Sequence, residues 1–190
     1  MGTKLIILFI CISTFLKAQD VSNGERKGLI KATGSFYKSN MLNCSISHFY
    51  LGGNSEYFFS DKYSFRGDIY LLIGEKNNAG YSMKNTSMLS AGFNRNFSKG
   101  KWCPTLGFYT GVTNLHMVSL LETFAPDFNH PTVQLIPHIG ISAGVQYFFF
   151  TYFHFFAEAR YIHQLNPFQP TLLDEISYTG GLGFQIPLLK

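Results

Sequence analysis

Residues 49–73, FYLGGNSEYFFSDKYSFRGDIYLLI, decide the fold. On each side of Ser60, Asp61 and Lys62, apolar and polar residues alternate with a period of two, which indicates β-strands with two different faces. Only a register with an even residue sum keeps the two apolar faces together, and a three-residue turn at 60–62 provides that register. The stretch therefore predicts a β-hairpin in which Glu56 lies opposite Arg66.

The same alternation predicts two more hairpins and two single strands. The second hairpin is expected to turn on Lys99 and Gly100, and the third on residues 150–152. A first strand over 28–37 and a last strand over 176–186 bring the expected number to eight. Tight turns at 60–62, 98–101 and 150–152 alternate with longer connections at 38–43, 76–86, 114–132 and 165–174. Short turns at one end and long loops at the other are typical of outer-membrane barrels.

The first 18 residues predict export of the chain. Lys4 precedes an apolar run from Leu5 to Leu16, and Ala18 offers a small residue for cleavage, which is the layout of a secretory signal peptide. The run is shorter than the roughly 20 residues of a membrane-spanning helix. Residues 19–190 are expected to form one domain.

The composition points to a membrane rather than to water. Charged residues make up 14% of the chain and aromatic residues 17%, whereas soluble domains average about 25% charged residues. No later apolar run is long enough for a spanning helix, so the chain can cross a membrane only as a closed barrel. The lysines and arginines are scattered, which argues against a nucleic-acid surface.

Three features indicate that the apolar face meets lipid. The polar face is rich in small residues that suit a narrow interior: Ser90, Gly92, Gly107, Gly111, Gly140, Gly144, Gly181 and Gly183. Arg95 is the one charge on the apolar faces, and it lies near a turn, where it can reach water. Aromatic residues of the apolar face gather near the tight turns and predict an interfacial girdle: Tyr57, Phe59, Tyr63, Phe65, Phe97, Trp102, Tyr147, Phe149 and Phe153.

The sequence therefore predicts an all-β protein, an eight-stranded antiparallel up-and-down transmembrane β-barrel. Residues 45–74, with their YFFSDK turn, resemble the small outer-membrane β-barrel proteins related to OmpX and OmpA, as do Ala157–Tyr161 and Gly181–Leu188. The resemblance implies contact with outer-membrane lipid and with the insertion machinery. The last strand of such barrels commonly ends on an aromatic residue, whereas here Phe184 is the last aromatic and the chain ends at Lys190.

Inward-facing charges form a second group of candidates: Lys31, Glu56, Arg66, Asp68, Glu158 and Arg160. They could provide a proton path or a catalytic carboxylate pair, but a structural ion-pair network is the favoured interpretation, because an unpaired buried charge is costly. His48, His138 and His154 also point inward without metal-ligand spacing, so we expect no metal and no cofactor. We expect Cys44 and Cys103 to be free thiols.

No catalytic signature stands out. The stretch 160–166 faintly resembles an element of lipid A deacylases, but Leu165 occupies the position of the nucleophilic serine. Loop 114–132 is rich in apolar residues. It is expected to fold over the barrel mouth, which is the favoured interpretation, or to bind an extracellular partner or a lipid. The favoured function is non-enzymatic, in envelope structure, adhesion or recognition. The alternatives are a soluble periplasmic lipocalin-like lipid carrier and a lipid A-modifying enzyme.

Overall fold

The computed structural model describes residues 26–42, 46–77, 81–83, 86–98, 100–119, 132–165 and 174–188. These residues form β-strands joined by turns: β1 Leu29–Met41, β2 Ile46–Phe58, β3 Tyr63–Asn77, β4 Tyr81–Met83, β5 Ser87–Asn96, β6 Trp102–Ser119, β7 Thr132–Phe148, β8 Phe153–Gln164 and β9 Glu175–Pro187. The predicted signal peptide, residues 1–18, lies outside the described residues.

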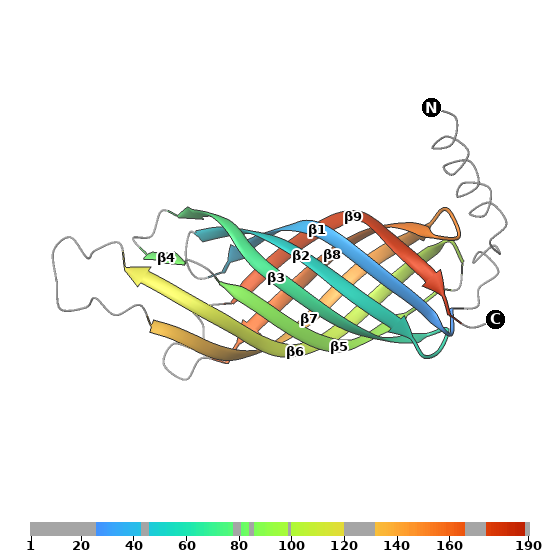
Figure 1. The fold of residues 1–190 in the computed structure, drawn as a ribbon, viewed down its shortest axis with the longest axis horizontal. Helices are drawn as coiled ribbons and strands as arrows, with labels where there is room; N and C mark the ends of the chain where they lie inside the picture. The colour runs from blue at the N-terminus through green and yellow to red at the C-terminus, as the bar shows by residue number, and fades with distance from the viewer. Residues whose placement is uncertain are drawn as a thin grey trace, which may run out of the picture.

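The eight long strands close into an antiparallel barrel (Figure 1). Each long strand pairs with the next one along the chain, and β9 pairs with β1 to complete the ring. The tight turns between β2 and β3, β5 and β6, and β7 and β8 gather at one end, which we call the turn end. The opposite end, where the longer connections lie, we call the loop end. The predicted eight-stranded up-and-down barrel is confirmed.

The short β4 and the ends of β6 and β7 extend the sheet at the loop end. Tyr81–Met83 pairs with the last residues of β6, beyond the segment of β6 that pairs with β5. On the other side, β6 pairs with β7 as far as Met117 and Thr132. β7 pairs with β8 only from His138 onward. The β6–β7 hairpin therefore projects past β8, and we call this part, residues 112–119 and 132–137, the hairpin extension.

The hairpin registers test the parity argument. Glu56 lies opposite Arg66, as predicted. In the second hairpin Asn96 lies opposite Thr105. The parity is right, but a turn on Lys99 and Gly100 would place Asn96 opposite Cys103, so the predicted register is wrong by two residues. This corner is not an isolated tight turn, because neighbouring elements bind it: Gly100 O accepts a hydrogen bond from the Arg26 guanidinium, and Lys101 O accepts one from Phe148 N.

The strands are longer at the loop end than the sequence predicts. β1 continues to Met41 rather than ending at residue 37, and β3 continues to Asn77 within the expected 76–86 connection. Beyond an apolar band a strand no longer needs to alternate apolar and polar residues, so its pattern gives no sign of where it stops. The predicted connections 38–43 and 76–86 are accordingly too long.

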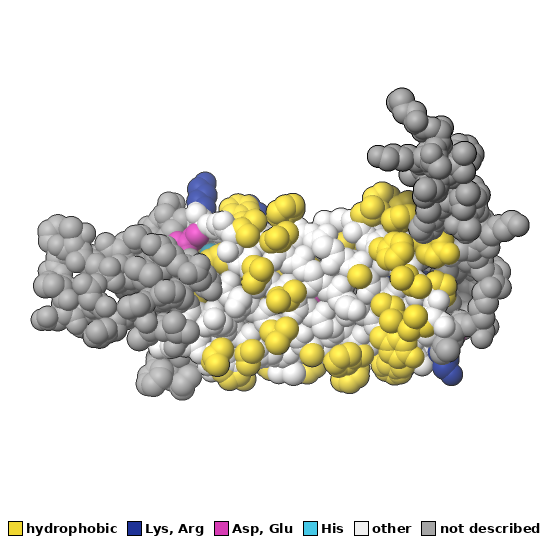
Figure 2. Space-filling model, in the orientation of Figure 1, with side chains coloured by type: hydrophobic (Ala, Val, Ile, Leu, Met, Phe, Trp, Pro, Cys, Tyr) yellow, Lys and Arg dark blue, Asp and Glu magenta, His cyan; other side chains and the backbone are white. Residues whose placement is uncertain are grey.

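The barrel carries its apolar residues on the outside. Every long strand exposes at least one large apolar residue: Phe36, Leu51, Ile69, Leu89, Phe108, Ile141, Phe155 and Leu182. Figure 2 shows such side chains across the visible wall, most densely toward the turn end. The inside holds most of the buried charged and polar residues. Among the described residues, no helix has the length and hydropathy needed to cross a membrane.

Candidate functional site

The turn end of the lumen is closed by Arg26, a residue that sequence reasoning missed. Arg26 precedes β1, and Gly28, with a φ of 80° that favours glycine, lets the chain fold under the barrel. The guanidinium is 1% exposed and lies 4.5 Å from the centre of the Phe148 ring. Its Nη1 donates to Cys103 Sγ at 2.6 Å, and the Arg26 backbone N donates to Asp61 Oδ1 at 2.9 Å. No strand periodicity marks this position.

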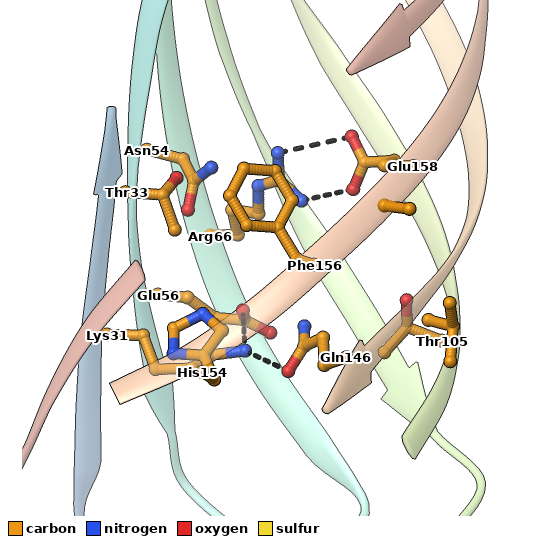
Figure 3. A pocket seen from close by; sticks show the side chains of 12 residues that line it. Lys31, Thr33, Asn54, Glu56, Arg66, Thr105, Gln146, His154, Phe156 and Glu158 are labelled. Carbon is orange, nitrogen blue, oxygen red and sulfur yellow. Dashed lines mark hydrogen bonds and ion pairs between the residues drawn. The ribbon is translucent and has the colours of Figure 1, made fainter. Parts of the chain in front are cut away.

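The first ion pair, between Lys31 and Glu56, lies in the lumen on the loop-end side of Arg26 (Figure 3). Lys31 Nζ is 2.6 Å from Glu56 Oε2 and donates to Gln146 Oε1 at 2.6 Å. Glu56 Oε1 accepts hydrogen bonds from Ser64 Oγ and, at 2.9 Å, from Asn94 Nδ2. Both charged residues are at most 2% exposed, and each has a partner for its charge.

The second ion-pair group joins Arg66, Asp68, Glu158 and Arg160. Arg66 Nη2 lies 2.7 Å from Asp68 Oδ1, and the Arg66 guanidinium also binds Glu158. Arg160 Nη2 lies 3.1 Å from both Asp68 Oδ1 and Glu158 Oε1. The group contains two cations and two anions. The Arg160 guanidinium also lies 4.3 Å from the Tyr109 ring centre, a distance suited to cation–π attraction.

The structure thus places the six predicted lumen charges in two groups rather than in one network. Glu56 faces Arg66 across the β2–β3 ladder, yet the closest cation to Glu56 is Lys31 on β1. Among the described residues, Asp68 Oδ2 and Arg160 Nε and Nη1 have no hydrogen-bond partner. A cavity of about 10 Å³, room for roughly one water molecule, lies between the two groups.

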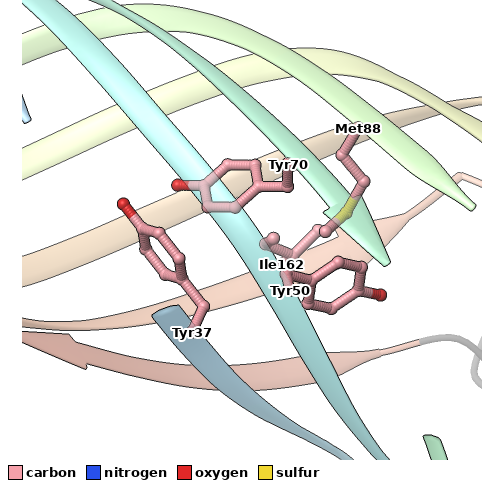
Figure 4. Close-up of a cluster of buried hydrophobic side chains, with 5 residues drawn as sticks. All are labelled: Tyr37, Tyr50, Tyr70, Met88 and Ile162. Atoms are coloured by element: carbon pink, nitrogen blue, oxygen red, sulfur yellow. The ribbon is translucent and has the colours of Figure 1, made fainter. Parts of the chain in front are cut away.

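An apolar layer separates these charges from the loop end (Figure 4). It consists of Tyr37, Tyr50, Tyr70, Met88 and Ile162, each at most 3% exposed. The Tyr37 and Tyr70 rings meet edge to face, 4.6 Å apart. An eight-stranded barrel has room only for packed side chains, and this layer fills its share of the lumen. Among the described residues, this layer and the two ion-pair groups pack side chains across the lumen.

Two of the three inward-facing histidines, His48 and His138, occupy the lumen nearer the loop end, whereas His154 lines the cavity beside Lys31 and Glu56. His138 is bonded on both sides, at 2.9 Å by Ser90 Oγ and at 3.0 Å by Thr113 Oγ1. His48 is fully buried, with its nitrogens 3.6 Å from Glu175 and 3.8 Å from Glu75. In the part of the chain that the structure describes, no three ligand side chains converge on a point where a metal ion could bind.

The side chains of the stretch compared with lipid A deacylases point to both faces of the barrel. Arg160 faces the lumen within the second ion-pair group, whereas His163 faces outward and bonds Asp174 Oδ1 at 2.8 Å. Leu165, in place of the serine, is 45% exposed. Cys103 is a buried free thiol, and Cys44 lies outside the described residues.

The candidate girdle residues lie on the outer wall near the turn end. The ring centres of Trp102 and Tyr147 are 4.6 Å apart, and those of Phe149 and Phe155 are 4.5 Å apart. Trp102, at 62% exposed, is among the most accessible of them. Arg95 lies in the same region, with its guanidinium 5.2 Å from the Phe97 ring centre.

Comparisons with solved structures agree on the fold. OprG of Pseudomonas aeruginosa is 13% identical, with a TM-score of 0.60 over 86% of this chain and 98% of that one. The Neisserial surface protein NspA is 16% identical, with a TM-score of 0.54 over 84% and 96%. The attachment invasion locus protein Ail of Yersinia pestis is 11% identical, with a TM-score of 0.54 over 84% and 99%. No family model and no curated protein matches the sequence.

The fold is therefore that of the small outer-membrane β-barrels. The sequence resemblance to such barrels is confirmed at the level of fold. The apolar outward face of the barrel, which we call the outer wall, suits this fold, because lipid solvates an apolar surface at a lower cost than water does. The chain has the architecture of the small β-barrels found in the outer membrane of Gram-negative bacteria.

Proposed function

We propose that this protein is a non-enzymatic outer-membrane barrel that recognises an extracellular partner through loop 114–132, which the hairpin extension carries. The observation that carries the proposal is the projection of β6 and β7 past β8, with Met117 still paired to Thr132. Short turns lie in the periplasm in such barrels, so the extension would stand outside the cell. The filled lumen supports a role on the surface rather than in transport.

The composition of loop 114–132, which includes the tip of the hairpin extension, favours an apolar protein partner. Loop 114–132 has the acidic residues Glu122 and Asp127, no lysine or arginine, and an apolar set: Met117, Val118, Leu120, Leu121, Phe124 and Phe128. Ail has been solved in complex with the heparin analogue sucrose octasulfate. A loop without lysine or arginine is a poor match for such a polyanion, so adhesion to proteins is the better candidate.

The roles of the other predicted residues follow from the same proposal. The two lumen ion-pair groups would link strands on different sides of the lumen. The aromatic girdle would fix the depth of the barrel at the periplasmic interface. Residues 1–18 would direct export and be removed. The lipocalin-like alternative does not fit, because it needs an apolar interior and a polar exterior. The enzyme alternative lacks its nucleophile at Leu165.

Cell adhesion tests the proposal directly. The protein is produced in a Gram-negative host, and adhesion to epithelial monolayers and to heparin-coated surfaces is compared with that of a variant in which residues 117–132 are replaced by a two-residue Asn-Gly turn. We expect the variant to fold, to be exposed at the surface and to lose epithelial adhesion. Equal adhesion by the folded variant would contradict the proposal, and adhesion to heparin alone would point to a different partner.

A further inference from the structure

The seam between the first and last strands of the barrel is interrupted near its middle. The register is the same on both sides of the interruption, since Thr33 pairs with Gly183 and Tyr37 pairs with Thr179. The three residues of each strand that lie between these pairs form no ladder pairs with one another, although β1 and β9 both continue through this region. We call these residues, 34–36 and 180–182, the seam interruption.

The other seven seams between the described long strands have no comparable interruption. Their ladders run residue by residue, with one register shift in the β2–β3 ladder beside Phe49 and Tyr50. Ladder hydrogen bonds hold neighbouring strands together. The β1–β9 seam is therefore held less firmly at mid-height than the seams on the rest of the barrel.

Side-chain hydroxyls bind the backbone at the seam interruption. Thr179 Oγ1 donates to Phe36 O at 3.1 Å, and Ser35 Oγ bonds Thr179 Oγ1 and, at 3.4 Å, Phe36 O. Backbone groups of alternate residues in a strand face the same neighbouring strand, and Gly28 O also faces β9, where it accepts a hydrogen bond from Leu188 N. Phe36 O is therefore a carbonyl of the seam, and a side chain of β9 binds it.

The seam interruption lies between an open part of the outer wall and the lumen cavity. On the outer wall, a Cβ at Gly34 would meet nothing within 4 Å, and Phe36 is 71% exposed. On the lumen side, a Cβ at Gly181 would lie 3.4 Å from the Phe156 ring. Phe156 also lines the cavity between the two ion-pair groups (Figure 3). The Phe156 ring therefore borders both the cavity and the seam interruption.

We propose that the barrel wall opens locally at the seam interruption, where β1 and β9 part at mid-height while both ends of the seam stay paired. The absent ladder pairs lower the cost of parting, because the remaining contacts of Phe36 O are with the hydroxyls of Ser35 and Thr179. Displacement of the Phe156 ring would then connect the lumen cavity with the outer wall. The inference concerns the wall of the barrel and is independent of partner binding by loop 114–132.

Hydrogen–deuterium exchange of the refolded barrel in lipid nanodiscs, measured for each residue by NMR, tests the inference. Exchange of native-state amides reports local opening. Gly34 lies two residues before Phe36 on the same face of the ladder, and Gly180 lies opposite Phe36 in the register. The amides of Gly34 and Gly180 should exchange about tenfold faster than those of the β5–β6 seam at the same height, residues 89–93 and 108–112.

A reversible cross-link across the seam provides a matched control. A Cβ at Gly181 would lie 3.5 Å from Ser35 Cβ, which is within the range of a disulfide. The variant Ser35→Cys/Gly181→Cys, made together with Cys44→Ser, can therefore be compared in its oxidised and reduced forms. Oxidation should slow amide exchange at Gly34 and Gly180 by about tenfold and leave exchange in the β5–β6 seam unchanged.

A hydroxyl deletion tests the same opening in the other direction. Thr179→Val removes the donor to Phe36 O and should speed exchange at the seam interruption about fivefold. The control is Thr110→Val, because Thr110 Oγ1 donates to His138 O at 3.3 Å in the uninterrupted β6–β7 ladder. This control should leave exchange in that ladder nearly unchanged.

Three results would overturn the inference. They are wild-type exchange at the seam interruption as slow as in the β5–β6 seam, no slowing on oxidation of the cross-linked variant, and no change in Thr179→Val. Heat-modifiable gel migration establishes that each variant is folded, and so separates local opening of the seam from failure of the whole barrel.

Discussion

The inner and outer walls of this barrel obey different rules. Inside, each charge has named partners: Lys31 binds Glu56, while Arg66 and Arg160 share Asp68 and Glu158. Outside, most of the aromatic residues contact other aromatic residues, as Trp102 contacts Tyr147 with ring centres 4.6 Å apart. A side chain on the inner wall must match its neighbours in shape and charge, whereas one on the outer wall must only be compatible with its depth in lipid.

This difference predicts where the barrel tolerates change. The described inner face of the barrel is filled with buried polar and charged side chains, with a cavity for about one water molecule between the two ion-pair groups. It is therefore packed like the core of a soluble protein, but with polar residues. The outer wall faces a fluid that adapts to the side chains it meets. Substitutions should therefore be severe inside and mild outside, unless a substitution on the outer wall introduces a charge at the midplane.

The largest effect is expected from Glu158→Ala on the inner wall. Removal of this carboxylate leaves Arg66 and Arg160 with only Asp68 between them, and an uncompensated buried charge costs about 3–5 kcal/mol. Urea unfolding in lipid vesicles should show a corresponding drop in the free energy of unfolding. Gln134→Ala, at an exposed position of the hairpin extension, is the control. An unfolding midpoint equal to that of the wild type would show that the ion-pair group does not stabilise the barrel.

The next effect tests whether the outer wall is tolerant only of apolar side chains. Ile69 lies near the middle of β3 and is 51% exposed. An arginine at the bilayer midplane costs about 2–4 kcal/mol, and one near the interface about 0–1 kcal/mol. Ile69→Arg should therefore destabilise the barrel in vesicles far more than Tyr63→Arg at the turn end of the same strand. Similar costs for both variants would mean that β3 does not cross the membrane as proposed.

A pair of glycines sharpens the comparison without any change of charge. A Cβ at the inward-facing Gly107 would overlap the Tyr109 hydroxyl and Asn94 Oδ1, whereas a Cβ at the outward-facing Gly34 would meet nothing within 4 Å. Overpacking of this kind costs about 1–3 kcal/mol. We expect Gly107→Ala to lower the free energy of unfolding by that amount and Gly34→Ala to leave it nearly unchanged. The reverse order would contradict the assignment of the two walls.

The sequence predicted the walls better than it predicted the contacts across the lumen. Period-two alternation assigned the faces, and the even residue sum at 60–62 gave the correct pairing of Glu56 with Arg66. The choice of Lys31 as the partner of Glu56 depends on side-chain reach inside the closed ring, which a single hairpin does not reveal. The placement of Arg26 at the turn end of the lumen depends on a backbone turn at Gly28, which strand periodicity does not predict.

The sequence also predicted the ends of the strands poorly. At the second hairpin, parity left registers two residues apart equally acceptable, and contacts with Arg26 and Phe148 decide between them. At the loop end, β1 and β3 continue past the apolar band, where the sequence no longer alternates. Hydrophobic patterning thus reports the membrane-embedded part of a strand, while the rest follows from hydrogen bonding to neighbouring strands.

The smallest effect concerns Trp102, the single tryptophan of the chain, and it measures the depth of the outer wall directly. Trp102 begins β6 at the turn end and is 62% exposed, and a girdle residue should lie at the headgroup boundary. Phospholipids brominated near the glycerol ester should therefore quench its fluorescence more than lipids brominated near the chain ends. Trp102→Phe keeps an apolar ring at the interface and is expected to change stability by less than about 1 kcal/mol. Stronger quenching from the chain ends would place the turn end inside the hydrocarbon and shift the whole outer wall relative to the membrane.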